Sequence, residues 1–137
     1  MKHVYMDTSA VLKRYIVEED SEACEEILSN FQYFTTSNIG VTETLINLRR
    51  KLAGREIELA VRLFEADLDS YNIVAFNGEI GRAAVEVSGG KNLATLDSIH
   101  IASALRFKNQ DITFLTYDRA QALAARRNGL KTLGVLS

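Results

Sequence analysis

The stretch that decides the fold is His3–Leu12, HVYMDTSAVL, near the start of the chain. Its apolar residues 4–6 are typical of a short buried strand, and the apolar run stops at Asp7. Two hydroxyl residues of helix-capping type follow, and Ala10–Ile16 continues with helical spacing. We therefore expect a carboxylate where a strand ends and a helix begins. In open α/β sheets, this is the edge at which ligands bind.

Asp7 on its own has two interpretations. Its side chain is either a helix N-cap, which accepts a hydrogen bond from the backbone, or a functional carboxylate at the sheet edge. The same pattern returns at Asp118, which follows the apolar segment Ile112–Thr116 and precedes a helical segment. This recurrence favours the functional interpretation.

The rest of the chain alternates between segments of strand type and segments of helical periodicity. The expected strands are residues 4–6, Phe31–Thr36, Tyr71–Phe76, Ile112–Thr116 and Leu130–Leu136. The expected helices are Ala10–Ile16, Ser21–Asn30, Val41–Leu52, Glu56–Asp69, Gly78–Val87, Leu96–Leu105 (opened by Asp97) and Arg119–Asn128. Residues 35–38 form a polar break between the second strand and its helix. Helices between strands enforce parallel pairing, so we predict one three-layer α/β domain over residues 1–137, with the sheet in the middle.

The composition is that of a globular domain with a real core. Of 137 residues, 47% are hydrophobic and 25% are charged. Cys24 is the single cysteine and has no partner for an internal disulfide, which indicates a reducing compartment. No apolar run reaches membrane-spanning length, and the first residues lack the apolar core of a signal peptide. We expect a cytoplasmic protein.

The charge balance does not decide whether the partner is a nucleic acid. The formal net charge is −2, whereas nucleic-acid binders are usually basic. The argument weakens if some of the acids serve a metal ion. Five basic residues gather around the predicted helical hairpin and form either a solvated face or a phosphate-contacting rim: Arg49, Arg50, Lys51, Arg55 and Arg62.

Four carboxylates are predicted to meet at one edge of the sheet. Asp7 and Asp118 follow strands, while Glu43 and Asp97 are expected in the first turns of helices that start at the same edge. Each acid alone has a capping explanation, but four together repel one another unless a cation lies between them. Oxygen ligands without a cysteine or histidine cluster favour Mg²⁺ or Mn²⁺ over zinc.

These segments resemble the PIN-domain ribonucleases, most closely the toxin subunits of VapBC-type toxin–antitoxin pairs. The likeness lies in DTSAVLKRY at Asp7, TETLINLRR around Glu43, LATLDSIHIASAL at Asp97 and FLTYDRAQALAARRNGL at Asp118, in the family's order. It implies a five-stranded parallel sheet in the order 3-2-1-4-5. It also implies an acidic quartet of Asp7, Glu43, Asp97 and Asp118 as catalytic and metal-binding residues, with hydroxyl groups at Ser9 and Thr116 beside it.

The resemblance implies a metal-dependent endoribonuclease, a toxin held in check by a cognate antitoxin. One or two Mg²⁺ or Mn²⁺ ions would bind the scissile phosphate of RNA and activate a water. Asp7 and Asp97 are expected as main ligands, with Asp118 binding directly or through water. Glu43 is either a ligand or the group that orients the attacking water. The family also implies a homodimer.

Other residues near these motifs have weaker assignments. Ser98 departs from the alanine common in the family, and a hydrogen bond to Asp97 is one expected consequence. His100 is expected as a packed or surface histidine, with a general acid as the alternative. Tyr117 is expected to pack, with base stacking as the alternative. Three basic side chains are generic candidates for an RNA path: Lys13, Arg14 and Lys91.

Three other functions compete with the nuclease hypothesis. A phosphatase of the haloacid-dehalogenase kind needs Asp-x-Asp after the first strand, and Ser9 occupies the second position. A receiver-like module requires adjacent acids near the end of the first strand, and only Asp7 is present there. A catalytically inert PIN-like module that binds a metal or a partner is the alternative that stays open.

Overall fold

The computed structural model describes residues 2–135, and its centre is a five-stranded parallel sheet in the order β3-β2-β1-β4-β5. The strands are β1 (His3–Met6), β2 (Tyr33–Ser37), β3 (Asn72–Val74), β4 (Ile112–Thr116) and β5 (Lys131–Gly134). The predicted strand order and parallel pairing are confirmed. β1 lies in the middle, between β2 and β4.

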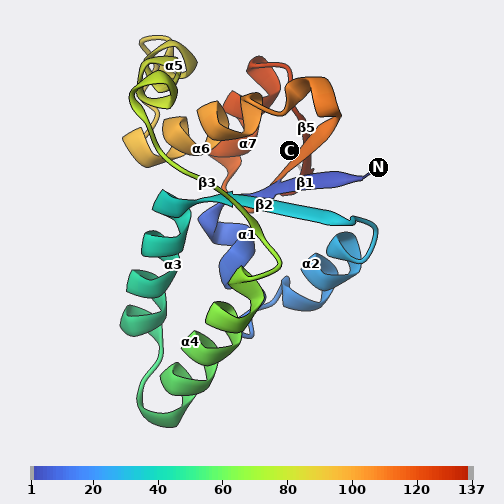
Figure 1. The fold of residues 1–137 in the computed structure, drawn as a ribbon, viewed down its shortest axis with the longest axis vertical. Coiled ribbons are helices and arrows are strands. Elements are labelled where there is room, and N and C mark those ends of the chain that lie inside the picture. The colour runs from blue at the N-terminus through green and yellow to red at the C-terminus, as the bar shows by residue number, and fades with distance from the viewer. Residues whose placement is uncertain (1, 136–137) are drawn as a thin grey trace.

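Helices cover both faces of the sheet, so the predicted three-layer architecture is confirmed (Figure 1). One side carries α5 (Gly78–Ser88), α6 (Thr95–Leu105) and α7 (Arg119–Arg127). The other side carries α1 (Thr8–Leu12), α2 (Ser21–Leu28), α3 (Asn38–Lys51) and α4 (Gly54–Leu68). A short 3₁₀ helix, Lys108–Gln110, precedes β4. Within residues 2–135, no helix combines the length and the apolar character that crossing a membrane requires.

The central strand β1 contributes side chains to both apolar layers. Val4 and Met6 pack with α1, α2 and α4 on one face, and Tyr5 packs on the other face beside Phe114, with the two rings stacked. All of these side chains are fully buried. A parallel strand covered on both faces reads as a continuous apolar run, which is why residues 4–6 show no alternation.

Two predicted helix starts or ends beside the candidate site need correction. The first helix was expected over Ala10–Ile16, but α1 ends at Leu12 and the chain continues as tight turns. Backbone bonds from residues 13, 14 and 15 to the third residue before each close these turns. The helix expected from Val41 begins at Asn38, because the Ser37 hydroxyl caps it by accepting a hydrogen bond from Ile39 N at 3.0 Å.

The other strands and helices occur where they were expected, with ends shifted by a few residues. The expected polar break at residues 35–38 is wrong, because residues 35–37 belong to β2 and α3 begins at Asn38. β3 is shorter than the predicted strand Tyr71–Phe76. The last strand was predicted through Leu136; the structure ends it at Gly134, and position 136 lies outside the described residues.

Candidate active site

The site lies at the carboxyl ends of the two central strands. Asp7 follows β1 and Asp118 comes two residues after β4, and these strands are paired in parallel with Met6 opposite Leu115. The backbone of Asp7 also donates to Leu115 O at 3.2 Å. The chain leaves β1 towards one side of the sheet and β4 towards the other, so the two acids flank a topological switch point.

Asp7 is buried and held by three donors. Its Oδ1 accepts from the Ser9 hydroxyl at 2.7 Å and from Ala10 N at 3.0 Å, while its Oδ2 accepts from the Thr116 hydroxyl at 2.5 Å. Burial raises the pKa of the Asp7 carboxyl, and the nearby His100 and these hydrogen bonds act in the opposite direction. Asp7 is thus both the N-cap of α1 and a fixed carboxylate at the switch point.

Two hydroxyls tie the two strand ends together. The Ser9 hydroxyl accepts from Tyr117 N at 2.9 Å, and the Thr116 hydroxyl accepts from Asp118 N at 3.1 Å. Asp118 itself caps α7, because its Oδ1 accepts from Gln121 N at 3.0 Å. The same side chains that orient Asp7 therefore also set the turn that carries Asp118.

Asp97 has no capping role. α6 begins at Thr95, so Asp97 is the third residue of its first turn, and no side chain caps this helix. Burial raises the pKa of the Asp97 carboxyl to about 6, and the like charges of Asp118, Asp7 and Glu43 act in the same direction. The negative charges of three other acids act on Asp97, which caps no helix, so its ionised form is costly and its placement calls for another explanation.

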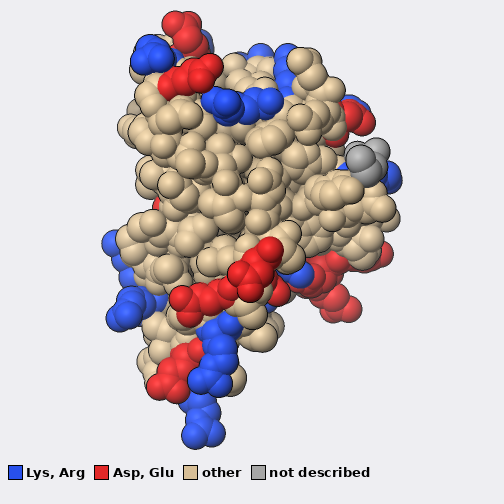
Figure 2. Space-filling view, in the orientation of Figure 1, with Lys and Arg blue, Asp and Glu red and all other residues tan. Residues whose placement is uncertain are grey.

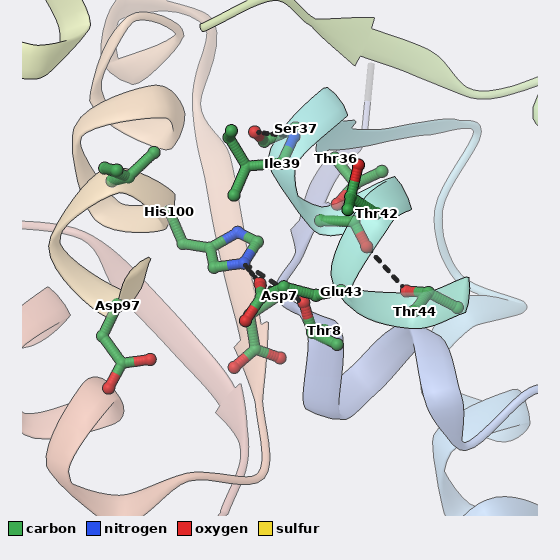
Figure 3. Close-up of polar contacts among 12 residues, drawn as sticks. Asp7, Thr8, Thr36, Ser37, Ile39, Thr42, Glu43, Thr44, Asp97 and His100 are labelled. Atoms are coloured by element: carbon green, nitrogen blue, oxygen red, sulfur yellow. Dashed lines mark hydrogen bonds and ion pairs between the residues drawn. The ribbon is translucent and has the colours of Figure 1, made fainter. Parts of the chain in front are cut away.

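Glu43 approaches the site from α3. It lies in the second turn of that helix rather than the predicted first turn, because α3 begins at Asn38. Its Oε1 accepts from the Thr8 hydroxyl at 2.7 Å and lies 2.8 Å from His100 Nε2 (Figure 3). Burial acts to raise the pKa of Glu43, but these two partners outweigh it and the pKa is lowered.

The four acids match a divalent cation in donor type and in charge. All are oxygen ligands, and Mg²⁺ and Mn²⁺ prefer such ligands. Burial and then the like charges of the other acids raise the pKa of Asp97, and a bound cation opposes both effects. In the arrangement over residues 2–135, however, no three Asp, Glu, His or Cys side chains come together closely enough to hold an ion. Figure 3 shows Asp97 on α6, apart from the group formed by Asp7, Glu43 and His100. Closing such a site therefore requires side-chain movement.

Comparison with known proteins identifies the family. A model of the PIN domain matches residues 4–127, which include all four acids. The chain belongs to the PIN domain family. This confirms the resemblance that the sequence motifs indicated.

Three individual proteins illustrate the likeness of this PIN domain. The chain is 29% identical over 133 residues to ribonuclease VapC47 of Mycobacterium tuberculosis (strain CDC 1551 / Oshkosh), covering 94% of both chains. Its fold is similar to that of FitAcB from Neisseria gonorrhoeae, with a TM-score of 0.74, 19% identity and 96% of both chains covered. It is also similar to a chain of a toxin–antitoxin complex from Klebsiella pneumoniae, with a TM-score of 0.66, 13% identity, and 87% and 89% of the chains covered.

The PIN domain site contains one side chain that the sequence analysis assigned elsewhere. His100 was expected as a packed or surface histidine; it is buried and packed, but it also contacts Glu43. It stands three residues after Asp97 on α6, so both side chains share one helix face. The three-residue spacing from Asp97 could have indicated that His100 lies near the site. Its contact with Glu43 on α3 could not be predicted from the sequence. Thr8, the other donor to Glu43, was interpreted only as a helix-capping type.

Ser98 and Tyr117 are the two other side chains beside this PIN domain site for which the sequence led to an expectation. The expected hydrogen bond from Ser98 to Asp97 is absent, since the buried Ser98 hydroxyl has no partner among the described residues. Its side chain faces the space between α5 and α6 instead. Tyr117 is half-buried and packs on the α1 side of the sheet, with the Lys13 ammonium 5.0 Å from its ring centre.

The basic residues fall into two groups. Of the three expected RNA-path residues, Lys13 is paired with Glu18 at 3.4 Å and Arg14 with Glu25 at 2.8 Å, so these two already have internal partners. The third, Lys91, is exposed in the loop after α5. The hairpin group is solvent-exposed on α3 and α4, and Figure 2 shows Lys and Arg side chains along this part of the surface. It comprises Arg49, Arg50, Lys51, Arg55 and Arg62.

Proposed function

We propose that this PIN domain, over residues 1–137, is a Mg²⁺- or Mn²⁺-dependent endoribonuclease and the toxin of a type II toxin–antitoxin pair. The observation that supports it best is the uncapped Asp97 carboxylate, whose pKa is raised by burial and by the like charges of Asp118, Asp7 and Glu43. Helix capping explains Asp7 and Asp118, whereas the Asp97 side chain makes no hydrogen bond among the described residues. The similarity of the chain to ribonuclease VapC47 supports RNA as the substrate.

The proposed ligands are Asp7, Asp97 and Asp118, with Glu43 as a further ligand or as the group that orients water. A divalent cation, when bound, would neutralise charge on the phosphodiester and lower the pKa of a water, so that the water gives up a proton and attacks phosphorus as hydroxide. Asp7 is fixed by Ser9, Ala10 N and Thr116, so its direction is set before any ligand arrives. This kind of preorganisation is what a phosphoryl-transfer site requires.

Glu43 is the residue best placed to handle the proton of the attacking water. Both its side-chain hydrogen bonds within the described residues end on Oε1. Oε2 is then the oxygen that accepts from the water, and its lowered pKa keeps the carboxylate ionised for this purpose. Attack by water on phosphorus breaks the bond to the leaving 3′-oxygen and yields a 3′-hydroxyl and a 5′-phosphate.

The proposed partners are RNA, a cognate antitoxin protein and a second copy of the chain. An antitoxin is supported by the fold similarity to a chain of the Klebsiella pneumoniae toxin–antitoxin complex. Leu59 and Leu63 on α4 and Val85 on α5 are large apolar side chains more than half exposed, which suits protein contacts. We further propose a cytoplasmic protein, in keeping with the single, unpaired Cys24.

The direct test is RNA cleavage by purified wild-type protein in Mn²⁺ or Mg²⁺, compared with EDTA and with Asp97→Asn. Cleavage by the wild type that is abolished by EDTA and by Asp97→Asn supports the proposal. A folded wild type that leaves all RNA substrates intact in both metals, and is harmless when expressed, supports the inert PIN-like module instead.

A further inference from the structure

His100 connects the core of the sheet to the carboxylate of Glu43. Its imidazole is 2% exposed, and Nδ1 lies 2.7 Å from the Tyr5 hydroxyl on β1. Nε2 lies 2.8 Å from Glu43 Oε1 and 3.2 Å from the Thr8 hydroxyl. One buried ring thus joins β1, α6 and α3 (Figure 3).

Both ring nitrogens have polar partners, and these partners fix the orientation of the ring. An ionised carboxylate only accepts hydrogen bonds, so Nε2 carries the hydrogen and donates it to Glu43. The other nitrogen, Nδ1, lies against the Tyr5 hydroxyl, so the ring is held from both sides. Burial raises the pKa of Tyr5, so this hydroxyl retains its proton at all ordinary pH values. Tyr5 thus fixes one side of the imidazole, and the other side contacts Glu43.

The backbone of α3 is shaped to let His100 reach Glu43. A Cβ atom at Gly40 would lie 3.0 Å from His100 Cε1 and 2.9 Å from the Thr36 hydroxyl. The Thr36 hydroxyl has little freedom to move, because it donates to Met6 O at 2.8 Å. Gly40 stands one turn before Glu43, so the missing side chain brings this turn of α3 against the imidazole.

A purely packing role does not require this arrangement. An aliphatic side chain would fill the same space between β1 and α3, while a buried imidazole is costly unless both nitrogens are bonded. Both nitrogens are bonded, and one of these bonds ends on a site carboxylate. Partners of this kind orient ligands, and their loss typically costs about 10–100-fold in metal affinity or activity.

We propose that His100, itself held by Tyr5, is a positioning residue that aims the Glu43 carboxylate at the acidic site. The inference rests on the proposed function and deepens it. His100 does not touch substrate and is not the general acid considered above; it acts through Glu43. Its loss leaves Glu43 with Thr8 as its one remaining side-chain donor among the described residues and lets the carboxylate turn.

The test compares His100→Gln with His100→Asn. The glutamine amide nitrogen reaches the position of Nε2 and keeps the donor to Glu43, whereas the shorter asparagine reaches only the position of Nδ1. Mn²⁺ affinity is measured by electron paramagnetic resonance, single-turnover RNA cleavage is measured at saturating Mn²⁺, and melting is followed in EDTA. We expect His100→Asn to lose about 10–100-fold in Mn²⁺ affinity or in cleavage rate, and His100→Gln to recover most of that loss.

Tyr5→Phe is a second variant that leaves every site atom in place. It removes only the hydroxyl that anchors the far side of the ring, so it remains informative if His100→Asn does not fold. A several-fold loss of Mn²⁺ affinity supports the positioning role. A lower melting temperature with unchanged Mn²⁺ affinity and cleavage in all three variants overturns it, because that is the result of packing alone.

The two proposals fail in different ways. Wild-type protein that binds Mn²⁺ and cuts RNA, with His100→Asn equal to it, overturns the role of His100 and leaves the nuclease intact. Wild-type protein that binds no Mn²⁺ and cuts no RNA overturns both.

Discussion

The Thr116 hydroxyl donates to Asp7 Oδ2 at 2.5 Å, across the boundary between the two central strands. The two residues are 109 positions apart in the chain and lie at the ends of β4 and β1. This bond fixes a buried carboxylate at the point where the sheet changes its winding direction. The bond therefore has two roles: it joins the ends of two strands, and it orients a carboxylate of the candidate site.

Thr116→Val tests the first of these roles. The variant keeps the shape of the side chain but leaves the buried Asp7 without one donor, so we expect the free energy of unfolding at pH 7 to fall by about 1–3 kcal/mol. Urea denaturation measures it. Thr113→Val on the same strand is the matched control, because the Thr113 side chain makes no hydrogen bond within residues 2–135, and it should stay within about 0.5 kcal/mol. Equal losses in the two variants would contradict the role of the Thr116–Asp7 bond.

Asp97→Asn should stabilise the metal-free protein. The pKa of Asp97 is raised in the fold from its ordinary value of 3.8 to about 6, so ionisation costs more in the native state than in the unfolded chain. The native protein then loses stability as pH rises from about 4 to 6, and the variant removes this loss. Each pKa unit is worth about 1.4 kcal/mol, but Asp97 is partly exposed, so screening leaves on the order of 1 kcal/mol. Melting in EDTA should show a gain of roughly 3 °C at pH 7 and a smaller gain at pH 4.5, near the start of this pH window.

Divalent metal should raise the melting temperature of the wild type above that of Asp97→Asn. A ligand that binds only the folded state raises the melting temperature, so Mn²⁺ should stabilise the wild type much more than Asp97→Asn. Glu58→Gln, an exposed change on α4, is the control and should respond to Mn²⁺ as the wild type does. If Asp97→Asn lowers the melting temperature in EDTA and Mn²⁺ has no effect on either protein, Asp97 has a structural role.

Gly40→Ala should destabilise the protein and impair the site together. The new methyl group meets the Thr36 hydroxyl and the His100 ring at about 3 Å, so α3 must shift. Overpacking of this kind costs about 1–3 kcal/mol. Gly78→Ala at the start of α5 is the control: its nearest contact is the end of the Arg82 side chain at 3.5 Å, and it should be neutral or slightly stabilising. Calorimetry and RNA cleavage would be measured on both, and a Gly40→Ala protein with wild-type values for each would contradict the predicted clash.

The exposed basic residues of the α3–α4 hairpin should affect RNA binding rather than chemistry. Charge removal in Arg50→Gln and Arg55→Gln should raise KM with kcat unchanged. It should also lower the dependence of binding on salt by roughly one ion for each phosphate that the variant no longer neutralises. Arg127→Gln, an exposed change at the end of α7, serves as the control. A fall in kcat at constant KM would place these arginines in the chemical step instead.

The element pattern was predictable because it depends on short stretches of sequence. The apolar residues 4–6 and Ile112–Thr116 are covered on both faces, and a fully buried parallel strand leaves that signature. The strand order was predicted only from the resemblance to a family, because several orders of parallel strands are compatible with the same alternation of strands and helices. The start of α3 was predicted three residues late, because the Ser37 cap belongs to a polar run that also reads as a loop.

The sequence by itself determined where carboxylates stand relative to strands and helices, and it predicted that four of them gather at one sheet edge. Only the tertiary structure decided which of them are caps and which are free: Asp7 and Asp118 cap helices, while Asp97 caps nothing. It also decided that His100 bonds Glu43 across 57 positions of chain. Capping and periodicity are local and can be read over a few residues, whereas a contact between α6 and α3 depends on how closely two helices pack across a shared sheet edge.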